Sequence, residues 1–258
     1  MQDSLPPGIS KLTPCPLLVR GEGKTPFMQT IVIPSFNQAK YLPEAIESAL
    51  SQWLPGEIVD RWYCPIIIVD DGSTDGSLEI AKSYAKQHSQ IKVISQVNKG
   101  LASARNTGIM NSTTDYCLFL DADDILLDDC VKKIDEVIKG TNADIIAPSF
   151  KEFGLGQREV ILGNPTLEDF KSANRIGYCS AIKREALLEV GGYNPKMVWG
   201  AEDYDLWFDL LKRGKKLVTI PKILWLYRIK ANSMWIETQK HYDDFMKQIK
   251  TNHHELFR

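Results

Sequence analysis

Three carboxylates stand together where one apolar run of the chain ends. Asp121, Asp123 and Asp124 directly follow the apolar residues 117–120. Crowded carboxylates disfavour one another's ionisation unless a cation neutralises them. Mg²⁺ or Mn²⁺ suits this task, because such ions bind one or two carboxylates and leave positions open for substrate phosphates. These residues indicate a divalent-metal site; the alternative is a solvated turn with a helix-capping aspartate.

A second acidic pair, Asp70 and Asp71, follows the apolar residues 65–69 and leads into Gly72 and Ser73. One of two adjacent carboxylates can hold the loop backbone while the other faces a ligand. A carboxylate accepts hydrogen bonds from a base N–H or from ribose hydroxyls, so a nucleotide is a sensible ligand. The alternative is a simple turn with a helix N-cap, which Asp, Gly and Ser all favour.

A basic segment between these two clusters contains Lys99, Gly100 and Arg105. Gly100 permits a tight backbone turn, and the two cations bring positive charge toward the carboxylates. Arg105 could pair with Asp71 or Asp121, or contact a diphosphate. The sequence contains neither the P-loop pattern nor the glycine fingerprint of dinucleotide-binding proteins, which argues against both of those classes.

A fourth cluster opens a predicted helix near residue 200. Glu202 and Asp203 stand in its first turn, Tyr204 follows them, and Trp199 precedes them. Acidic residues in a first turn interact favourably with the helix dipole, and that is the purely structural alternative. Two aromatic rings beside bunched carboxylates could instead shape a pocket for a ring-shaped substrate.

Strand-like and helix-like segments alternate along the chain and must position these clusters. Continuous runs of Ile, Val and Leu indicate strands buried on both faces, as in a parallel sheet between helices. Ligands of such sheets bind at the carboxyl ends of the strands, where the polar clusters lie. The sequence thus predicts an α/β fold with strands near residues 30–34, 65–69, 91–97 and 116–120, and helices near 42–53, 78–84, 101–110 and 128–138.

The composition narrows the class of protein. The 258 residues include 31 Lys and Arg against 33 Asp and Glu, a net charge of −2, which argues against a nucleic-acid-binding protein. An average content of apolar and charged residues excludes disordered, collagen-like and coiled-coil chains. Five scattered cysteines without a C-x-x-C pair favour free thiols in a reducing compartment, with Cys64 and Cys117 in the core. No apolar stretch reaches the roughly 18–20 residues of a membrane span, and no signal-peptide pattern begins the chain. We therefore expect a cytoplasmic protein, with peripheral contact at the inner face of a membrane as an option.

The two ends of the chain differ from its middle. Residues 1–27 contain five prolines and no regular period, so we expect an irregular extension, and Met28 is a candidate natural start. Residues 239–258 carry apolar residues at helical spacing, which predicts an amphipathic helix folded against the core. The alternative for this helix is contact with a membrane surface or a partner protein.

Taken together, these segments resemble the family 2 glycosyltransferases, which bind nucleotide sugars and have the GT-A fold. The resemblance covers about residues 29–230 and implies a Rossmann-like, mostly parallel sheet flanked by helices. It implies one domain at 28–230, with a nucleotide-sugar-binding half at 28–127 and an acceptor-binding half at 128–230, followed by a helical extension at 231–258. The motifs occur in the family's order at residues 31–37, 68–75, 98–106, 120–124 and 199–207.

The resemblance implies a role for each matching residue. Asp203 would be the catalytic base, and Glu202, Trp199 and Tyr204 would contact the acceptor. Asp123 would be the main ligand of a Mn²⁺ or Mg²⁺ ion, and Asp71 would accept a hydrogen bond from the nucleotide base. The nucleotide-binding residues would be Pro34, Phe36, Asn37, Asp71, Lys99, Arg105, Asp121 and Ala122.

One departure from the family pattern concerns the diphosphate. Many relatives have histidine two residues after the arginine of a Tyr-Arg-x-His stretch, where this chain has Tyr227, Arg228, Ile229 and Lys230. A protonated lysine cannot ligate a metal, but it can bind phosphate as a point charge. We therefore interpret Lys230 as a diphosphate contact; an inert surface lysine is the alternative.

The implied reaction is inverting transfer of a sugar from a nucleoside diphosphate, UDP being favoured, to an acceptor hydroxyl in glycan or polysaccharide biosynthesis. The acceptor could be a glycan, a lipid-linked sugar or a small molecule. Three alternatives are a sugar-phosphate nucleotidyltransferase, a haloacid-dehalogenase-type phosphatase and a non-catalytic nucleotide-sugar-binding protein. The first usually has a glycine-rich loop after its first strand, whereas residues 35–40 contain no glycine. A haloacid-dehalogenase-type phosphatase would have Thr or Val two residues past the second aspartate, where this chain has Ile125.

Overall fold

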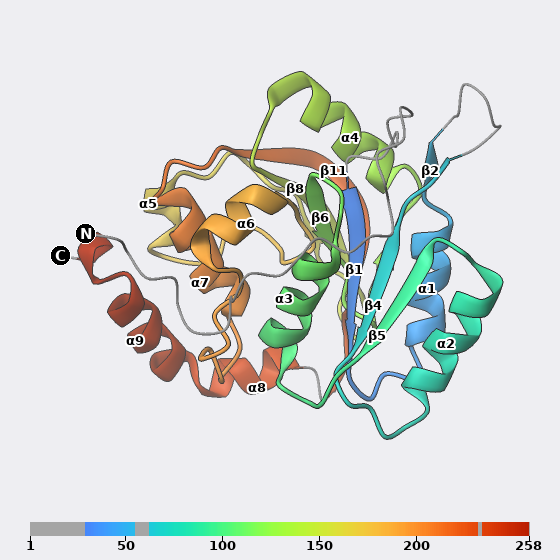
Figure 1. The fold of residues 1–258 in the computed structure, drawn as a ribbon. Coiled ribbons are helices and arrows are strands. Elements are labelled where there is room, and N and C mark those ends of the chain that lie inside the picture. Colours follow the sequence, from blue (N-terminus) through green and yellow to red (C-terminus); the bar gives the residue numbers. More distant parts are fainter. Residues whose placement is uncertain (1–28, 55–61, 232–233, 258) are drawn as a thin grey trace, which may run out of the picture.

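The computed structural model describes residues 29–54, 62–231 and 234–257. The predicted N-terminal extension, with Cys15 and Met28, lies outside these residues. Within them, a nine-stranded sheet runs through the middle of the molecule with helices on both sides (Figure 1). Its strand order is β5-β4-β1-β6-β10-β8-β11-β7, and β9 pairs with β8. The predicted α/β class is confirmed.

Four parallel strands form the N-terminal half of the sheet. β1 pairs with β4 and β6, and β4 pairs with β5, each time in parallel. Every residue of β1, β4 and β6 is buried, as their apolar runs predict. The strands are β1 (Gln29–Ser35), β4 (Ile66–Asp70), β5 (Ile91–Ser95) and β6 (Tyr116–Phe119).

The helices between these strands lie on both faces because parallel crossovers are right-handed. The chain steps outward from β1 to β4 and β5 through α1 and α2, and steps back to β6 through α3. Accordingly α3 lies on the face opposite α1 and α2 (Figure 1). The strand order reverses at β1, which creates the crevice where open α/β sheets bind ligands. These helices are α1 (Leu42–Leu50), α2 (Ser77–Gln87) and α3 (Leu101–Asn111), and α4 (Cys130–Thr141) follows β6.

One predicted helix is shorter than expected. The apolar spacing extends to Trp53, but α1 ends at Leu50, where the N–H groups of Ser51 and Gln52 donate to carbonyls of the last turn. Trp53 belongs to a strand instead, so its match to the helical period was coincidental. This short second sheet consists of β2 (Trp53–Leu54) and β3 (Trp62–Tyr63).

The C-terminal half of the sheet mixes strand directions. β10 lies antiparallel between β6 and β8, whereas the 13-residue β11 runs parallel to β8 and carries β7 on its other edge. The elements are β7 (Ile125–Leu126), β8 (Ile145–Gly154), β9 (Glu159–Val160), β10 (Ala181–Lys183), β11 (Leu217–Ile229), α5 (Leu167–Phe170), α6 (Arg184–Val190) and α7 (Glu202–Leu211).

The C-terminal segment forms two helices and a 3₁₀ turn, α8 (Met234–Lys240), α9 (Tyr242–Asn252) and His254–Leu256. Phe245, Met246 and Ile249 of α9 are buried, so the predicted amphipathic helix does fold back, with a break at His241. The described helices include none long and apolar enough to cross a membrane. The division of residues 28–230 at position 127 stays a prediction.

The core continues through both halves of the sheet as one cluster of buried apolar residues. It contains Cys64, Cys117, Cys130 and Cys179, all with free thiols. Burial raises the pKa of the Cys117 thiol to about 11 and that of Cys130 to about 12, so these thiols are unreactive packing groups.

Candidate active site

A cavity of about 850 Å³ opens at the carboxyl ends of β1, β4 and β6. One wall, the strand-end side, comprises the residues that follow these strands together with the start of α3. A second part of the lining, the helix side, comprises residues 173–178, the start of α7 and parts of α8 and α9, and residues of β8, β9 and β11 complete the cavity. Of the predicted site residues, the cavity is lined by Pro34, Phe36, Asp71, Arg105, Asp121, Ala122, Asp123, Glu202, Asp203, Tyr204 and Lys230. Asn37, Lys99 and Trp199 are not among its lining residues.

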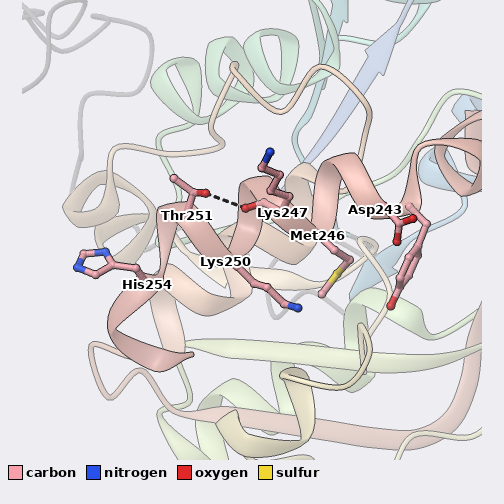
Figure 2. A pocket seen from close by; sticks show the side chains of 7 residues that line it. Asp243, Met246, Lys247, Lys250, Thr251 and His254 are labelled. Atoms are coloured by element: carbon pink, nitrogen blue, oxygen red, sulfur yellow. Dashed lines mark hydrogen bonds between the residues drawn. The ribbon is translucent and has the colours of Figure 1, made fainter. Parts of the chain in front are cut away.

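A second hollow, of about 720 Å³, lies along α9 and contains none of the predicted site residues (Figure 2). Its labelled side chains, among them Lys247 and Lys250 of α9 and His254 of the turn after it, point in different directions and do not converge on a common point (Figure 2). Ligand sites place polar groups so that they meet at the ligand. The sheet-end cavity is therefore the candidate active site.

Asp71 fastens the loop that borders the strand-end side. Its Oδ1 accepts hydrogen bonds from the Gln96 side chain at 2.7 Å and the Lys99 backbone N–H at 3.0 Å. Its Oδ2 accepts the Gly100 N–H at 2.8 Å. A carboxylate has about four acceptor positions, so Oδ2 keeps one for a ligand. Lys99 contributes here through its backbone, and Gln96 is a contributor that the sequence did not single out.

The neighbouring loop is shaped by Asn37, a residue in the left-handed region at φ 52°. Its side-chain oxygen accepts the Thr74 N–H at 2.8 Å, and its own N–H donates to the Ser73 hydroxyl at 3.0 Å. Asn37 thus joins the loop after β1 to the loop after β4. The Phe36 ring stands beside it, 45% exposed at the cavity wall. An exposed ring of this kind offers a flat face on which a base can stack.

Each carboxylate of the Asp121–Asp124 turn has its own partner. Asp121 forms an ion pair with Arg105 at 2.8 Å, and Asp123 forms one with Lys230. Asp124 is buried and is not among the residues that line the cavity; it accepts hydrogen bonds from the Tyr178 hydroxyl and from the Arg228 N–H at 2.6 Å.

Burial controls the protonation of this turn. Desolvation raises the pKa of Asp121 to about 6, although Arg105 opposes the shift. Desolvation also raises the pKa of Asp124, and the neighbouring charges of Asp123 and Asp121 add to the effect. The turn is therefore poised to gain from an added positive charge.

The donor atoms at this turn suit a hard divalent cation. Asp121 and Asp123 both line the cavity and offer carboxylate oxygens, the ligand type that Mg²⁺ and Mn²⁺ prefer. Asp124 does not line the cavity and is not such a ligand. A cation that binds here would compete with Arg105 and Lys230, whose side chains already form ion pairs with these carboxylates.

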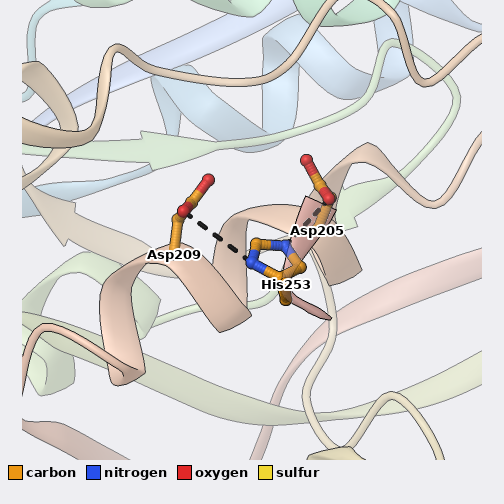
Figure 3. A group of neighbouring side chains, drawn as sticks. All are labelled: Asp205, Asp209 and His253. Atoms are coloured by element: carbon orange, nitrogen blue, oxygen red, sulfur yellow. Dashed lines mark hydrogen bonds and ion pairs between the residues drawn. The ribbon is translucent and has the colours of Figure 1, made fainter. Parts of the chain in front are cut away.

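A different acidic cluster brings Asp205, Asp209 and His253 together, with one ligand atom of each within 4.8 Å of the others (Figure 3). Lys212 points its ammonium at His253 Nδ1, 3.0 Å away, and so occupies the position that a metal would need. His253 Nε2 lies 2.9 Å from Asp205. Burial alone would raise the pKa of Asp205, but hydrogen bonds from His253, Asn252 and Asn194 lower it overall. This cluster attaches the C-terminal end of the chain to α7.

Asp203 occupies the first turn of α7 and lines the cavity on the helix side. Its carboxylate accepts the Tyr204 N–H at 2.7 Å and the Asn174 amide at 3.1 Å. Desolvation raises the pKa of Asp203 to about 7, the negative charge of Glu202 adds to this, and Arg105 opposes it. A carboxyl group with a pKa near 7 is suited to accept and release a proton at neutral pH.

The backbone before α7 is bent to present this turn. Gly200 and Ala201 both have positive φ, at 86° and 60°. A Cβ on Gly200 would meet the Thr238 hydroxyl of α8 at 2.4 Å, so only glycine fits between α7 and α8 at this point.

Arg105 connects the two sides of the cavity. Its guanidinium is buried, pairs with Asp121 on the strand-end side, and pairs with Glu202 on the helix side. The rings of Tyr178 and Tyr193 lie 5.0 and 5.2 Å from it. Of the partners considered from sequence, the structure selects Asp121 and not Asp71. Glu202, expected at the acceptor, lines the cavity but is engaged by Arg105.

Two aromatic residues expected at the acceptor differ in position. Tyr204 is buried and donates its hydroxyl to the Phe170 carbonyl, so it mainly supports α7. Trp199 is 43% exposed and stacks on His241 with ring centroids 3.8 Å apart. Their roles toward an acceptor stay predictions.

Sequence reasoning missed Asn174 and Tyr178, which lie in a segment with no regular period and no motif. It named Arg228 only as part of a stretch, although Arg228 Nε donates to the Asp123 carbonyl at 2.7 Å. The Tyr-Arg pair at 227–228 was the available signal for Arg228. Asn174 and Tyr178 had none, because their contacts reach far along the chain.

Known proteins with sequences similar to this chain are glycosyltransferases. The chain is 35% identical over 220 residues to the uncharacterized glycosyltransferase EpsJ of Bacillus subtilis, an alignment that covers 80% of this chain and 62% of EpsJ. Among the first curated relatives that it matches, the chain spans between 32% and 62% of the relative's length.

Solved structures show the same fold at low sequence identity. S. aureus TarS 1-349 in complex with UDP-GlcNAc is 18% identical with a TM-score of 0.71, covering 88% of this chain and 66% of TarS. The mannosyltransferase PcManGT from Pyrobaculum calidifontis, in complex with GDP-Man and Mn²⁺, is 18% identical with a TM-score of 0.65, covering 84% of this chain and 62% of PcManGT. Residues 30–191, more than half of the chain, match the sequence profile of glycosyl transferase family 2, and the chain belongs to that family.

Proposed function

We propose that this protein is an inverting glycosyltransferase that moves a sugar from a nucleoside diphosphate, UDP in the first place, to an acceptor hydroxyl. One observation carries the proposal: Asp123 and Asp203, from different elements, line the same cavity, and the pKa of Asp203 is raised to about 7. A site for a diphosphate and a proton acceptor thus face one shared space.

The strand-end side would bind the donor. Phe36 would stack on the base, and the remaining acceptor position of Asp71 would receive a base N–H. UDP as the nucleotide is supported by the UDP-GlcNAc complex of TarS, a protein with the same fold. The GDP-Man complex of PcManGT makes GDP the comparison nucleotide for any test.

Asp121 and Asp123 would hold a divalent cation, Mn²⁺ or Mg²⁺. When bound, such an ion neutralises negative charge on a departing diphosphate. Lys230 also stands at this point with its ammonium on Asp123, and a diphosphate in the cavity would lie within its field.

Asp203 would act on the helix side as the general base. It takes the proton from an acceptor hydroxyl, whose oxygen then bonds to the anomeric carbon of the sugar. The bond from that carbon to the diphosphate oxygen breaks, and its electron pair leaves with the nucleoside diphosphate. Attack from the face opposite the leaving group inverts the configuration in one displacement. Arg105 keeps Glu202 paired beside Asp203, which limits how far the pKa of the base rises.

The acceptor class follows from the open helix side, which we assign to a sugar hydroxyl in glycan or polysaccharide assembly. Trp199 and Tyr242, both partly exposed, stand by this side and would contact such a ring. A lipid-linked sugar, presented at the inner face of a membrane, is included in this class.

The experiment combines ligand screening with one variant. A thermal-shift panel of UDP, GDP and their sugars, with and without Mn²⁺, should single out the donor, because stabilisation grows with the logarithm of ligand concentration over Kd. Asp203→Asn should then lower the transfer rate by about 10²–10⁴-fold while UDP affinity changes less than twofold.

The matched control is Asp128→Asn, an exposed aspartate that is absent from the cavity lining. It should keep the transfer rate of the unmodified protein. Full transfer by Asp203→Asn would remove the base from the mechanism, and failure of every nucleotide to stabilise the chain would remove the donor site.

A further inference from the structure

The end of β11 is fastened to the turn that carries Asp123. Arg228 donates its backbone N–H to Asp124 at 2.6 Å and its Nε to the Asp123 carbonyl at 2.7 Å. β11 also pairs with β7, which follows that turn directly. These bonds fix the position of Lys230, two residues beyond Arg228, relative to the turn.

Lys230 uses this position to contact Asp123. Its ammonium forms an ion pair with the Asp123 carboxylate and lies 4.9 Å from the centre of the Tyr41 ring. The Lys230 and Asp123 side chains are only 16% and 19% exposed, so water screens the pair weakly. Arg228 lies over the same Tyr41 ring, at 4.8 Å, as expected for side chains two residues apart on one strand face.

The partners of the three neighbouring carboxylates differ in how readily they can be replaced. Arg105, which holds Asp121, is buried and pinned between two tyrosine rings. Asp124 is buried with its own donors. Lys230 is different, because its ammonium ends a flexible four-carbon stem and it lines the open cavity. Asp123 is therefore the carboxylate at which a second cation can exchange.

We infer that the Lys230 ammonium is a built-in cation of the diphosphate site. It competes with a divalent metal ion for Asp123, and it neutralises part of the diphosphate charge that the metal ion would otherwise neutralise. A protonated amine has no lone pair, so Lys230 cannot join a metal's ligand set, and its positive charge repels a metal ion at the same carboxylate. The apparent Kd for the metal is then the intrinsic Kd divided by the fraction of protein in which Lys230 has left Asp123.

The same arrangement gives Lys230 a second partner when a diphosphate is present, and this part rests on the proposed function. The ammonium can turn from Asp123 to a phosphate oxygen and free the carboxylate. Metal binding should therefore be weak in the free protein, and UDP binding should persist in part when divalent metal is withdrawn.

Binding of Mn²⁺ to the metal-free full chain, followed by electron paramagnetic resonance without nucleotide, tests the competition. Lys230→Met removes the ammonium at similar length, and we expect it to bind Mn²⁺ at least tenfold more tightly, about 1.4 kcal/mol. Lys230→His adds a ligand and should bind at least as tightly as Lys230→Met. Equal or weaker Mn²⁺ binding by both variants would overturn the inference.

Two controls locate the effect. Lys40→Met removes another ammonium over the same Tyr41 ring, 5.0 Å from its centre, and should leave Mn²⁺ affinity unchanged. Asp123→Asn combined with Lys230→Met should lose the gain, whereas a gain that persists would place the ion elsewhere, for instance at Asp205 and His253, and overturn the assignment. Circular dichroism confirms that each variant is folded.

UDP titration in EDTA tests the shared role. Lys230→Met should lose at least tenfold in UDP affinity relative to the unmodified chain in EDTA, and Mn²⁺ should reduce this difference. Equal UDP affinity of the two proteins in EDTA would refute the shared role. If the unmodified chain bound no UDP under any condition, the proposed donor site would fail, and the Mn²⁺ titration would still decide the competition at Asp123.

Discussion

On the strand-end side of the cavity, the polar residues stand directly after β1, β4 and β6, and most of their hydrogen bonds join one strand-end loop to the next. On the helix side, Asp203 is supported by Asn174 from an irregular segment, and α7 is held by contacts from α8 and the end of the chain. The first wall is a property of the sheet, and the second is assembled from distant segments. We conclude that the two walls can vary independently, except where Tyr178 and the Arg105 junction connect them.

Loss of that junction should have the largest effect. In Arg105→Met, the buried Glu202 and the partly buried Asp121 would lose their ion-pair partner, so we expect the free energy of unfolding to fall by about 3 kcal/mol. Urea unfolding followed by circular dichroism measures it. The control is Arg213→Met, at an exposed arginine just after α7. Its free energy of unfolding should stay within about 0.5 kcal/mol of that of the unmodified protein.

A loss below about 1 kcal/mol in Arg105→Met would contradict the role of Arg105 as the junction. Should that variant fail to fold, Arg105→Lys keeps one charge but cannot bond both carboxylates in the same geometry. It should show an intermediate loss of unfolding free energy.

The pH dependence of transfer tests Asp203 on the helix side, and Asp121, whose pKa is raised to about 6, adds a titration from the strand-end side. Asp203 must be ionised to accept a proton, so kcat/KM should rise about tenfold per pH unit below 7 and level off above it. The free energy of unfolding should change with pH in the opposite direction. The pKa of Asp203 in the folded protein lies above the unfolded value of 3.8, so its contribution to stability is fully present below pH 3.8 and is lost as the pH rises toward 7. UDP binding over the same range should not follow the Asp203 titration. A flat kcat/KM between pH 5 and 7 would argue against Asp203 as the base.

The strand-end wall is more regular, and this explains how much of the molecule could be predicted. The strands and the placement of Asp71 and Asp123 followed from apolar runs that end in polar clusters, because such runs report burial and strand ends directly. The Arg105–Glu202 pair, Asn174 and Tyr178 could not be predicted, since they join residues 29 to 97 positions apart with no local pattern. The prediction that the first helix extends to Trp53 was wrong because the local pattern misled. The apolar spacing continues past Leu50, where the helix ends.

Asp71→Asn tests the strand-end wall alone. The amide has one acceptor atom where the carboxylate had two, so it cannot hold the N–H groups of Lys99 and Gly100 and bind a base as well. We expect about tenfold weaker UDP binding by calorimetry and an unchanged pH profile of transfer. Asp115→Asn, an exposed aspartate before β6, is the control. Unchanged UDP affinity in Asp71→Asn would remove Asp71 from the base site.

The smallest effect should come from the rim of the helix side. Trp199→Ala removes an exposed ring stacked on His241, and we expect the KM for the acceptor to rise about threefold to tenfold without a change in UDP affinity. The neighbouring Val198→Ala, also exposed, should leave both quantities unchanged. An effect of Trp199→Ala on UDP affinity and none on acceptor KM would place this ring with the donor.

The buried bond between His253 and Asp205 has a consequence for how sequence changes near the C-terminal end affect α7. It connects the residue after α9 to α7, the helix whose second residue is Asp203. Substitutions in the tail, remote from any reacting atom, can therefore tilt the proton acceptor by fractions of an ångström while the nucleotide cradle stays as it is. In the proposed reaction, we expect such substitutions to change the rate of proton removal from the acceptor and to leave donor binding unchanged.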